Sequence, residues 1–208
     1  MAPKYKLTYF YFRAKGENIR QLLQLAGVEF EDRRIQWEQW PHIKKEMPFA
    51  QMPVLECEEG QLAQSKAIGR FLARRYGFAG SNDWEAARID ALMDQFEDFF
   101  QEIRPFYRTY NKIIEGNLDN VYETIVQPAR DKHLPLFAKF LDENPSGFLV
   151  GSKLSWIDTQ LADHLYTFMN YSKGDYTAQY PQLAAFKERI HATPRLREWI
   201  KDRPKTVI

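Results

Sequence analysis

The feature that most constrains the fold is a change of pattern near residue 83. Before it, short runs of β-branched and aromatic residues alternate with stretches of helical periodicity; after it, the apolar repeats have helical spacing. Such a change indicates two domains. We expect a first domain over residues 1–78, a linker over 79–82 and an all-helical domain over 83–208.

The first domain opens with a strand–helix–strand pattern. Residues 6–11 and 30–35 have the composition of strands, and between them apolar residues recur at helical spacing up to Gly27, a typical residue just beyond a helix end. This pattern predicts a βαβ unit with parallel strands. The segment around Trp37 and Trp40 that follows is predicted to be irregular.

A hairpin and a helix complete the first domain. Residues 53–57 and 61–63 flank a short Glu-Glu-Gly turn, which predicts two antiparallel strands. An apolar stripe beginning at Ile68 then predicts a helix that ends near Gly77. The order βαβ followed by ββα is that of a thioredoxin-like domain with a mixed sheet.

The second domain is predicted to be all-α. Apolar residues keep helical spacing from Ile89 to Ile103, which predicts one long helix. Ser155-x-x-Asp158 predicts a capping box with a role in folding. Further helices are expected over residues 120–142, 155–171, 181–192 and 194–201.

Charge and cysteine content exclude several classes of function. The chain has 29 Lys and Arg against 28 Asp and Glu, so no strong field favours nucleic acid or an anionic membrane. We see no signal peptide and no membrane-spanning stretch, and Cys57 is the single cysteine, which rules out an intrachain disulfide, a zinc cluster or a Cys-x-x-Cys redox pair. We expect a cytoplasmic protein.

Three positions of the first domain are candidates for a ligand site. Tyr9 stands at the end of a strand, where α/β folds collect ligands, although packing alone would also explain it. Met52-Pro53 by itself does not distinguish a cis proline beside a free backbone edge from an ordinary trans proline, but the surrounding thioredoxin-like pattern favours cis. Ser65 is expected to cap the helix that starts there, and such a helix start also binds carboxylates.

The remaining polar residues have ordinary explanations. Asp90, Asp94 and Asp98 form an acidic helix face that is either solvated or borders a dimer seam. The four histidines have no metal-ligand spacing, so we predict no metal. Cys57 is expected to be buried in a strand and unreactive.

Four motifs together resemble one known family. They are 5–10 (YKLTYF), 48–55 (PFAQMPVL), 64–68 (QSKAI) and the closing Arg203-Pro204. In order and spacing the chain is similar to sigma-class glutathione transferases from end to end. That class also contains the haematopoietic prostaglandin D synthase and transferases of worms and arthropods.

The resemblance implies a set of site residues. Tyr9 would be the catalytic residue, and Asp98 of the partner subunit in a homodimer would contact the amine of glutathione, the co-substrate. Residues after Phe100 would form the electrophile pocket, with Ile103, Arg104, Phe106, Tyr107 and Tyr110 as its wall. The remaining glutathione-binding residues would be Phe10, Arg13, Trp40, Lys44, Gln51, Met52, Pro53, Gln64 and Ser65. Ala14 and Lys15 depart from the Gly and Arg that the family often has there.

The resemblance implies conjugation of the glutathione thiolate to hydrophobic electrophiles, a detoxification reaction. The first alternative is a glutathione-dependent isomerase that acts on prostaglandin H2. The second is a non-enzymatic binding or structural protein on the same fold, which would have lost Tyr9 or the proline clamp. A thioredoxin-like redox protein is discounted because no Cys-x-x-Cys pair is present.

Overall fold

The computed structural model describes residues 4–172 and 175–206. The chain divides into two compact units, one comprising Met1–Ala79 with Arg189–Ile208 and the other comprising Gly80–Glu188. The first unit is therefore built from two segments that are far apart in the sequence.

A four-stranded sheet forms the centre of the first unit. It contains β1 (Tyr5–Phe10), β2 (Phe30–Ile35), β3 (Val54–Cys57) and β4 (Gly60–Ala63) in the order β2-β1-β3-β4. β1 and β2 are parallel, whereas β3 is antiparallel to both β1 and β4. The predicted thioredoxin-like fold with a mixed sheet is confirmed.

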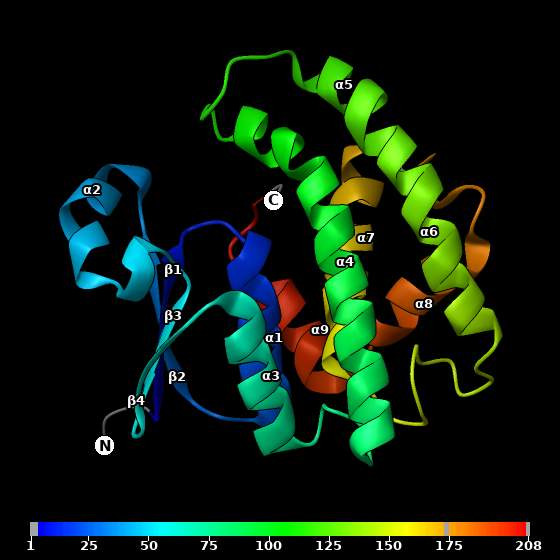
Figure 1. Ribbon diagram of the computed structural model, residues 1–208, viewed down its shortest axis with the longest axis horizontal. Helices are drawn as coiled ribbons and strands as arrows, with labels where there is room; N and C mark the ends of the chain where they lie inside the picture. Colours follow the sequence, from blue (N-terminus) through cyan, green and yellow to red (C-terminus); the bar gives the residue numbers. More distant parts are fainter. Residues whose placement is uncertain (1–3, 173–174, 207–208) are drawn as a thin grey trace. The chain divides into compact units, whose positions relative to one another are not determined.

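Two helices pack on one side of this sheet. α1 (Ala14–Ala26) and α3 (Ser65–Tyr76) contact each other and lie on the same side of the strands in Figure 1. Their buried residues include Leu22 and Leu72, neither of which is exposed to solvent. α1 ends at Gly27, whose left-handed backbone (φ 66°) suits glycine and confirms the predicted helix end.

The segment between β2 and β3 differs from the irregular structure that was predicted. It consists of short helical turns, namely 3₁₀ turns at Trp37–Gln39, Lys44–Glu46 and Pro48–Ala50 and the four-residue helix α2 (Trp40–Ile43). Each turn closes through local bonds; for example, the Gln36 amide donates to Gln39 Oε1 at 2.8 Å. Such turns need no long apolar period, so the sequence pattern does not reveal them.

The second unit is helical, as predicted. Its long helix is α4 (Asp83–Tyr110), and the Asn82 side chain caps it by accepting from the Glu85 amide at 2.9 Å. The expected helix over residues 120–142 is interrupted, because a π-helical turn joins a short first helix to a longer one. The other helices and this turn are α5 (Leu118–Val121), the π-helical Tyr122–Val126, α6 (Gln127–Asp142), α7 (Trp156–Tyr171) and α8 (Pro181–His191).

Pro128 gives a physical reason for that interruption. It lies in the first turn of α6 and has no backbone N–H to continue the α-helical hydrogen bonds across the join. The apolar period runs through the join unchanged, which is why the sequence predicted one helix.

The capping box at the start of α7 is confirmed. Asp158 is fully buried, and its Oδ2 accepts from both the amide and the hydroxyl of Ser155 at 2.7 Å. Its Oδ1 accepts from the Leu149 amide at 2.9 Å, so the same carboxylate also fixes the preceding loop. The role is structural, as the sequence indicated.

The C-terminal helix packs in the first unit rather than with the helical unit. α9 (Pro194–Asp202) contacts α1, and its Trp199 Nε1 donates to Glu17 Oε1 at 2.8 Å. Arg203 Nη1 donates to the same oxygen at 2.6 Å. The predicted domain over 83–208 therefore differs from the structural unit at its C-terminal end. The helical pattern of residues 194–201 carried no signal of its contact with α1.

Glu17 is the residue whose loss we expect to destabilise the first unit most. Its side chain is 1% exposed, and that of Arg203 is 3% exposed. Glu17→Ala removes the carboxylate that accepts from Trp199 and Arg203 and leaves these two donors without their partner. The free energy of unfolding should fall by about 3–5 kcal/mol. Urea unfolding should show a clearly lower midpoint.

Glu31→Ala is the matched control, because Glu31 is an exposed carboxylate on β2. It should change the free energy of unfolding by no more than about 0.5 kcal/mol. Equal midpoints for the two variants would contradict a structural role for Glu17.

Candidate functional site

The register of the strands brings three segments together at one end of the sheet. Thr8 of β1 pairs with Val54 of β3, and Val54 pairs with Ala63 of β4. Tyr9, Pro53 and Gln64 each lie one residue beyond these pairs, so they are neighbours across the strands. The three sequence motifs that suggested a site therefore meet in space.

Tyr9 is buried at this end of the sheet, with 6% of its surface exposed. Burial raises the pKa of its hydroxyl to about 12, and this effect outweighs a hydrogen bond from the Lys15 backbone amide that favours the phenolate. A Cβ on Gly16 would lie 2.3 Å from Tyr9 Cδ1, so glycine at position 16 lets the ring sit against α1. Tyr9 is thus a protonated hydroxyl in a fixed position.

Arg20 supports the chain around Tyr9. It is fully buried, and its guanidinium donates to the carbonyls of Phe10 and Phe12, each at 3.1 Å. Its Nε also pairs with Asp32 Oδ1 at 3.0 Å, and its Cζ lies 5.8 Å from the centroid of the Tyr9 ring. Arg20 therefore fixes the end of β1 and the segment that follows it.

Aromatic rings surround the end of β1. The Phe10 ring stacks on that of Phe12 with centroids 5.2 Å apart, and it lies 4.9 Å from Trp37 and 5.7 Å from Trp40. Phe10 and Trp40, both predicted site residues, thus belong to one cluster. The cluster provides an apolar wall beside Tyr9.

The proline segment is placed as expected. The Met52–Pro53 peptide bond is cis, as the sequence favoured. Met52 and Trp40 pack against a small cluster of Met47, Val54 and Ala63. Gln51 and Lys44 are exposed, and neither side chain forms a hydrogen bond or ion pair with any residue of the described chain.

The start of α3 corrects one prediction. Ser65 is the first residue of the helix and Gln64 is its N-cap, and no side chain caps the helix. Gln64 has φ 73° and ψ 113°, a conformation rare for any residue other than glycine and found mostly at functional sites. The Ser65 hydroxyl forms no hydrogen bond with another described residue, and no side chain caps the first backbone amides of α3. Both the hydroxyl and these amides can therefore donate to a ligand.

Arg13 and Ala14 form the start of α1. Arg13 is 2% exposed, and its carbonyl accepts from the amides of Gly16 and Glu17, both at 3.0 Å. Ala14 has φ 29°, in the region that glycine prefers. This is the position where the resembling family often has glycine.

The residues predicted on α4 divide into two groups. Asp98 is exposed and forms no ion pair among the described residues. Arg104 and Tyr110 are exposed and Tyr107 is half-buried, but Ile103 and Phe106 are fully buried. The Phe106 ring lies 5.1 Å from Phe168 and 4.9 Å from Tyr171, so it packs in the core of the helical unit.

Other chemical groups show no catalytic arrangement. Cys57 is half-buried rather than fully buried, its Sγ lies 3.5 Å from the Gly60 carbonyl as a weak donor, and burial raises the pKa of its thiol. Burial likewise lowers the pKa of His164 to about 3, and its Nε2 lies 2.8 Å from the Tyr176 hydroxyl. Within residues 4–172 and 175–206, no three His, Cys, Asp or Glu residues are grouped to hold a metal.

None of the helices in the described part of the chain combines the length and apolar character needed to cross a membrane.

Sequence reasoning missed Gly16, Glu17 and Arg20. Glu17 and Arg20 are one helical turn apart, with 3.6 Å between Glu17 Oε2 and Arg20 Nη1. On a sequence this spacing is typical of an exposed ion pair, and only the contacts with β2 and α9 reveal that both are buried. Gly16 gave no signal, because glycine near a helix start is common.

The fold and the site define a class in which a thioredoxin-like unit is followed by a helical unit. Two family models match: "Glutathione S-transferase, N-terminal domain" over residues 5–74 and "Glutathione S-transferase, C-terminal domain" over residues 97–203. Glutathione S-transferase 1 of Ascaris suum is 42% identical over 98% of both chains. The chain therefore belongs to the glutathione S-transferase family and is a glutathione transferase, with glutathione as co-substrate.

Solved structures agree in fold and differ in class. Na-GST-3 of the hookworm Necator americanus has a TM-score of 0.92 at 42% identity, covering 97% of this chain and 98% of that one, and it is described as monomeric. A Nu-class transferase of Haemonchus contortus has a TM-score of 0.87 at 40% identity, with 98% of each chain covered. Prostaglandin synthase D of Nilaparvata lugens has a TM-score of 0.86 at 37% identity, covering 98% of this chain and 100% of that one. These three structures, which are similar to this chain over nearly its whole length, are described as a monomeric transferase, a Nu-class transferase and a prostaglandin synthase.

Ala14 gives a test of backbone strain at the site. A residue with a side chain costs about 1–2 kcal/mol in the left-handed region, whereas glycine adds about 0.5–1 kcal/mol of chain entropy to the unfolded state. Ala14→Gly should therefore raise the free energy of unfolding by up to about 1 kcal/mol, measured by thermal and urea unfolding.

Ala26→Gly provides the control, because Ala26 is the last residue of the same helix. There glycine should lower stability by up to about 1 kcal/mol. If both substitutions destabilise equally, Ala14 is not strained.

Proposed function

We propose that this protein conjugates the thiolate of reduced glutathione to hydrophobic electrophiles, as a detoxifying enzyme of the cytoplasm, and that its sigma-class resemblance reflects its class. The observation that carries the proposal is Tyr9, a buried and protonated hydroxyl beside the Met52–Pro53 segment and the start of α3. This arrangement suits a donor aimed at a ligand held by the neighbouring backbone.

Hydrogen bonding from Tyr9 is enough to activate the thiol. A free thiol has a pKa of about 8.5, so only a small fraction is thiolate at neutral pH. A donor to a charged acceptor contributes about 1.5–3 kcal/mol, and one pKa unit corresponds to about 1.4 kcal/mol, so Tyr9 lowers the thiol pKa by about one to two units. The raised pKa of Tyr9 keeps the donor proton in place throughout this range.

Glutathione needs donors for two carboxylates and a partner for its ammonium. Gln64 and Ser65 would hold the γ-glutamyl carboxylate at the start of α3, where no side-chain cap competes for the amides. Gln51, Met52 and Pro53 would hold the peptide backbone. The residues that would line the rest of the pocket are Phe10, Arg13, Trp40 and Lys44.

We propose that the active form is a homodimer in which Asp98 of one chain contacts the ammonium of glutathione in the other. Asp98 supports this role because it is exposed and makes no ion pair with the described residues. For the electrophile pocket, the exposed or half-buried Arg104, Tyr107 and Tyr110 are better wall residues than the buried Ile103 and Phe106.

The two alternatives predict different reactions. A prostaglandin H2 isomerase would use the same glutathione site, whereas a binding or structural protein would not need the Tyr9 hydroxyl, which is present. Rates with an aryl halide, an alkenal, a hydroperoxide and prostaglandin H2 separate them. Preference for prostaglandin H2 would support the isomerase, and binding of glutathione without turnover of any substrate would support the binding protein.

Tyr9→Phe should lower turnover by about one to three decades, while glutathione affinity changes little, because the tripeptide is held by other groups. Loss of the donor disfavours the thiolate, so the acid limb of the pH–rate profile should move up by about one to two units. Steady-state kinetics across pH measure both effects.

Tyr11→Phe is the matched control, since Tyr11 is 42% exposed just beyond β1. Its profile should coincide with that of the wild type. A Tyr9→Phe profile that also coincides would refute the proposed thiolate contact.

Asp98→Ala should weaken glutathione binding by about tenfold, the loss expected for one charge-assisted contact. Calorimetry measures the change, and sedimentation of the same samples reports whether the protein is dimeric. Asp94→Ala, one helical turn away on the same face, should leave the dissociation constant unchanged. A monomeric protein, or equal affinities of the two variants, would contradict the contact between subunits.

A further inference from the structure

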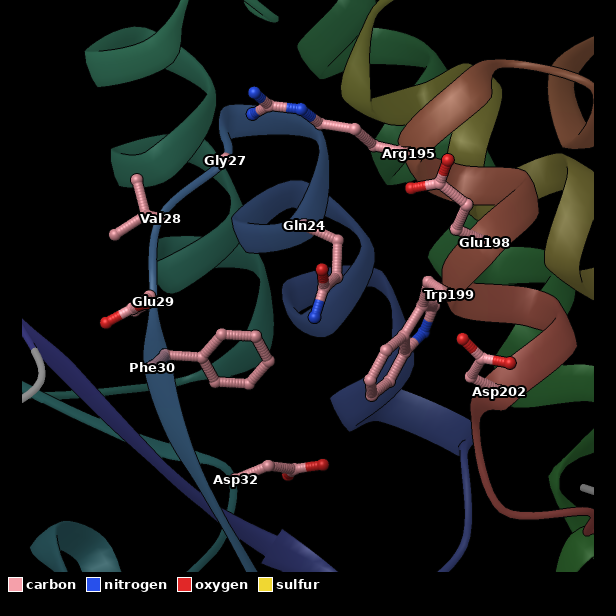
Figure 2. Close-up of a pocket in the computed structure, with 10 residues that line it drawn as sticks. All are labelled: Gln24, Gly27, Val28, Glu29, Phe30, Asp32, Arg195, Glu198, Trp199 and Asp202. Carbon is pink, nitrogen blue, oxygen red and sulfur yellow. The ribbon is translucent and has the colours of Figure 1, made fainter.

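A cavity lies in the first unit, away from Tyr9. It has a volume of about 750 Å³ and is bounded by the end of α1, the start of β2 and α9 (Figure 2). This volume is within the range of sites for small organic molecules. α1 starts beside the Tyr9 site and ends at this cavity, so the 13 residues of the helix separate the two sites by about 20 Å.

Two aromatic rings form an apolar floor. Phe30 of β2 and Trp199 of α9 are turned toward each other in Figure 2, with ring centroids 6.4 Å apart and planes inclined at 55°. Because the two ring planes are inclined, they form a V-shaped surface. One flat ring of a ligand can rest on this surface, but none can insert between Phe30 and Trp199. Trp199 is held in place because its indole N–H donates to the buried Glu17.

The cavity lining carries the cation Arg195 and the carboxylates of Glu29, Asp32, Glu198 and Asp202. Arg195 covers Gly27, where a Cβ would lie 1.5 Å from its Nη1, so its guanidinium occupies the C-terminal end of α1 that favours a cation. Glu198 and Asp202 project from α9 on the side of Trp199 (Figure 2). Asp32 also lines the cavity, but Arg20 and Arg34 already pair with it at 3.0 and 2.7 Å.

Three carboxylates of the cavity lining, those of Glu29, Glu198 and Asp202, form no ion pair with another described residue. Glu29 directly precedes β2, whereas Glu198 and Asp202 belong to α9. The latter two are exposed and lie four residues apart on one face of α9. Like charges at this spacing repel each other. Asp202 is also the last residue of α9, whose Ile200 and Lys201 carbonyls already accept from Lys205 Nζ at 3.2 and 2.8 Å. A bound cation would relieve the repulsion between Glu198 and Asp202.

We propose that this cavity binds amphipathic organic cations. The apolar body of the ligand rests on Phe30 and Trp199, and its protonated amine lies between the carboxylates of Glu198 and Asp202. The ligand class follows from the combination of an aromatic floor with two exposed carboxylates on α9 that form no ion pair among the described residues. The cavity is separate from the proposed glutathione site.

The test uses the full chain with saturating S-hexylglutathione, which blocks the transferase site. 1-Naphthylmethylamine is titrated by calorimetry, with 1-naphthylacetate as the probe of opposite charge. We expect the amine to bind at least about tenfold more tightly than the anion. The indole N–H resonance of Trp199, assigned with Trp199→Phe, should shift with the amine.

The double variant Glu198→Gln, Asp202→Asn should weaken binding of the amine by about tenfold or more. Glu31→Gln removes an exposed carboxylate of β2 outside the cavity and should leave the affinity unchanged. Thermal unfolding confirms that each variant is folded. The proposal is overturned if the amine does not bind while the transferase site is blocked. It is also overturned if amine and anion bind equally, or if the double variant matches Glu31→Gln.

Discussion

The buried carboxylate of Glu17 is the contact on which most of the first unit depends. A charge in this position is tolerated only because Trp199 and Arg203 donate to it and Arg20 lies within 3.6 Å. These bonds hold α9 on α1. Arg20 in turn binds the carbonyls of Phe10 and Phe12, so one polar network connects the C-terminal helix with the chain that leaves β1.

That network explains why Tyr9 is positioned so firmly. Its ring lies against Gly16 on one side, where a side chain would collide with it, and Arg20 holds the chain that follows it. The backbone amide of Lys15 donates a hydrogen bond to the Tyr9 hydroxyl. A hydroxyl held in this way needs no reorganisation before it donates, which is the condition that the proposed contact with a thiolate requires.

Much of the fold was readable because periodicity reports which side chains are buried. The four strands, the helices α1 and α3 and the Ser155–Asp158 capping box follow local rules, and the cis proline follows from the pattern of the surrounding domain. Contacts between distant segments were not readable: the partners of Glu17 lie more than 180 residues away. The predictions of one continuous helix over residues 120–142 and of a Ser65 cap were wrong, because periodicity reveals neither the π-helical turn before α6 nor the absence of a side-chain cap on α3.

The discontinuous first unit also bears on the order of events during synthesis. The motifs of the proposed glutathione site at Tyr9, Pro53 and Ser65 leave the ribosome before the helical unit is made, whereas α9 is made after it. Until then Glu17 lacks Trp199 and Arg203, and α1 has an apolar and charged face with no cover. The contacts that fix α9 on Glu17 can therefore form only after the helical unit has been synthesised.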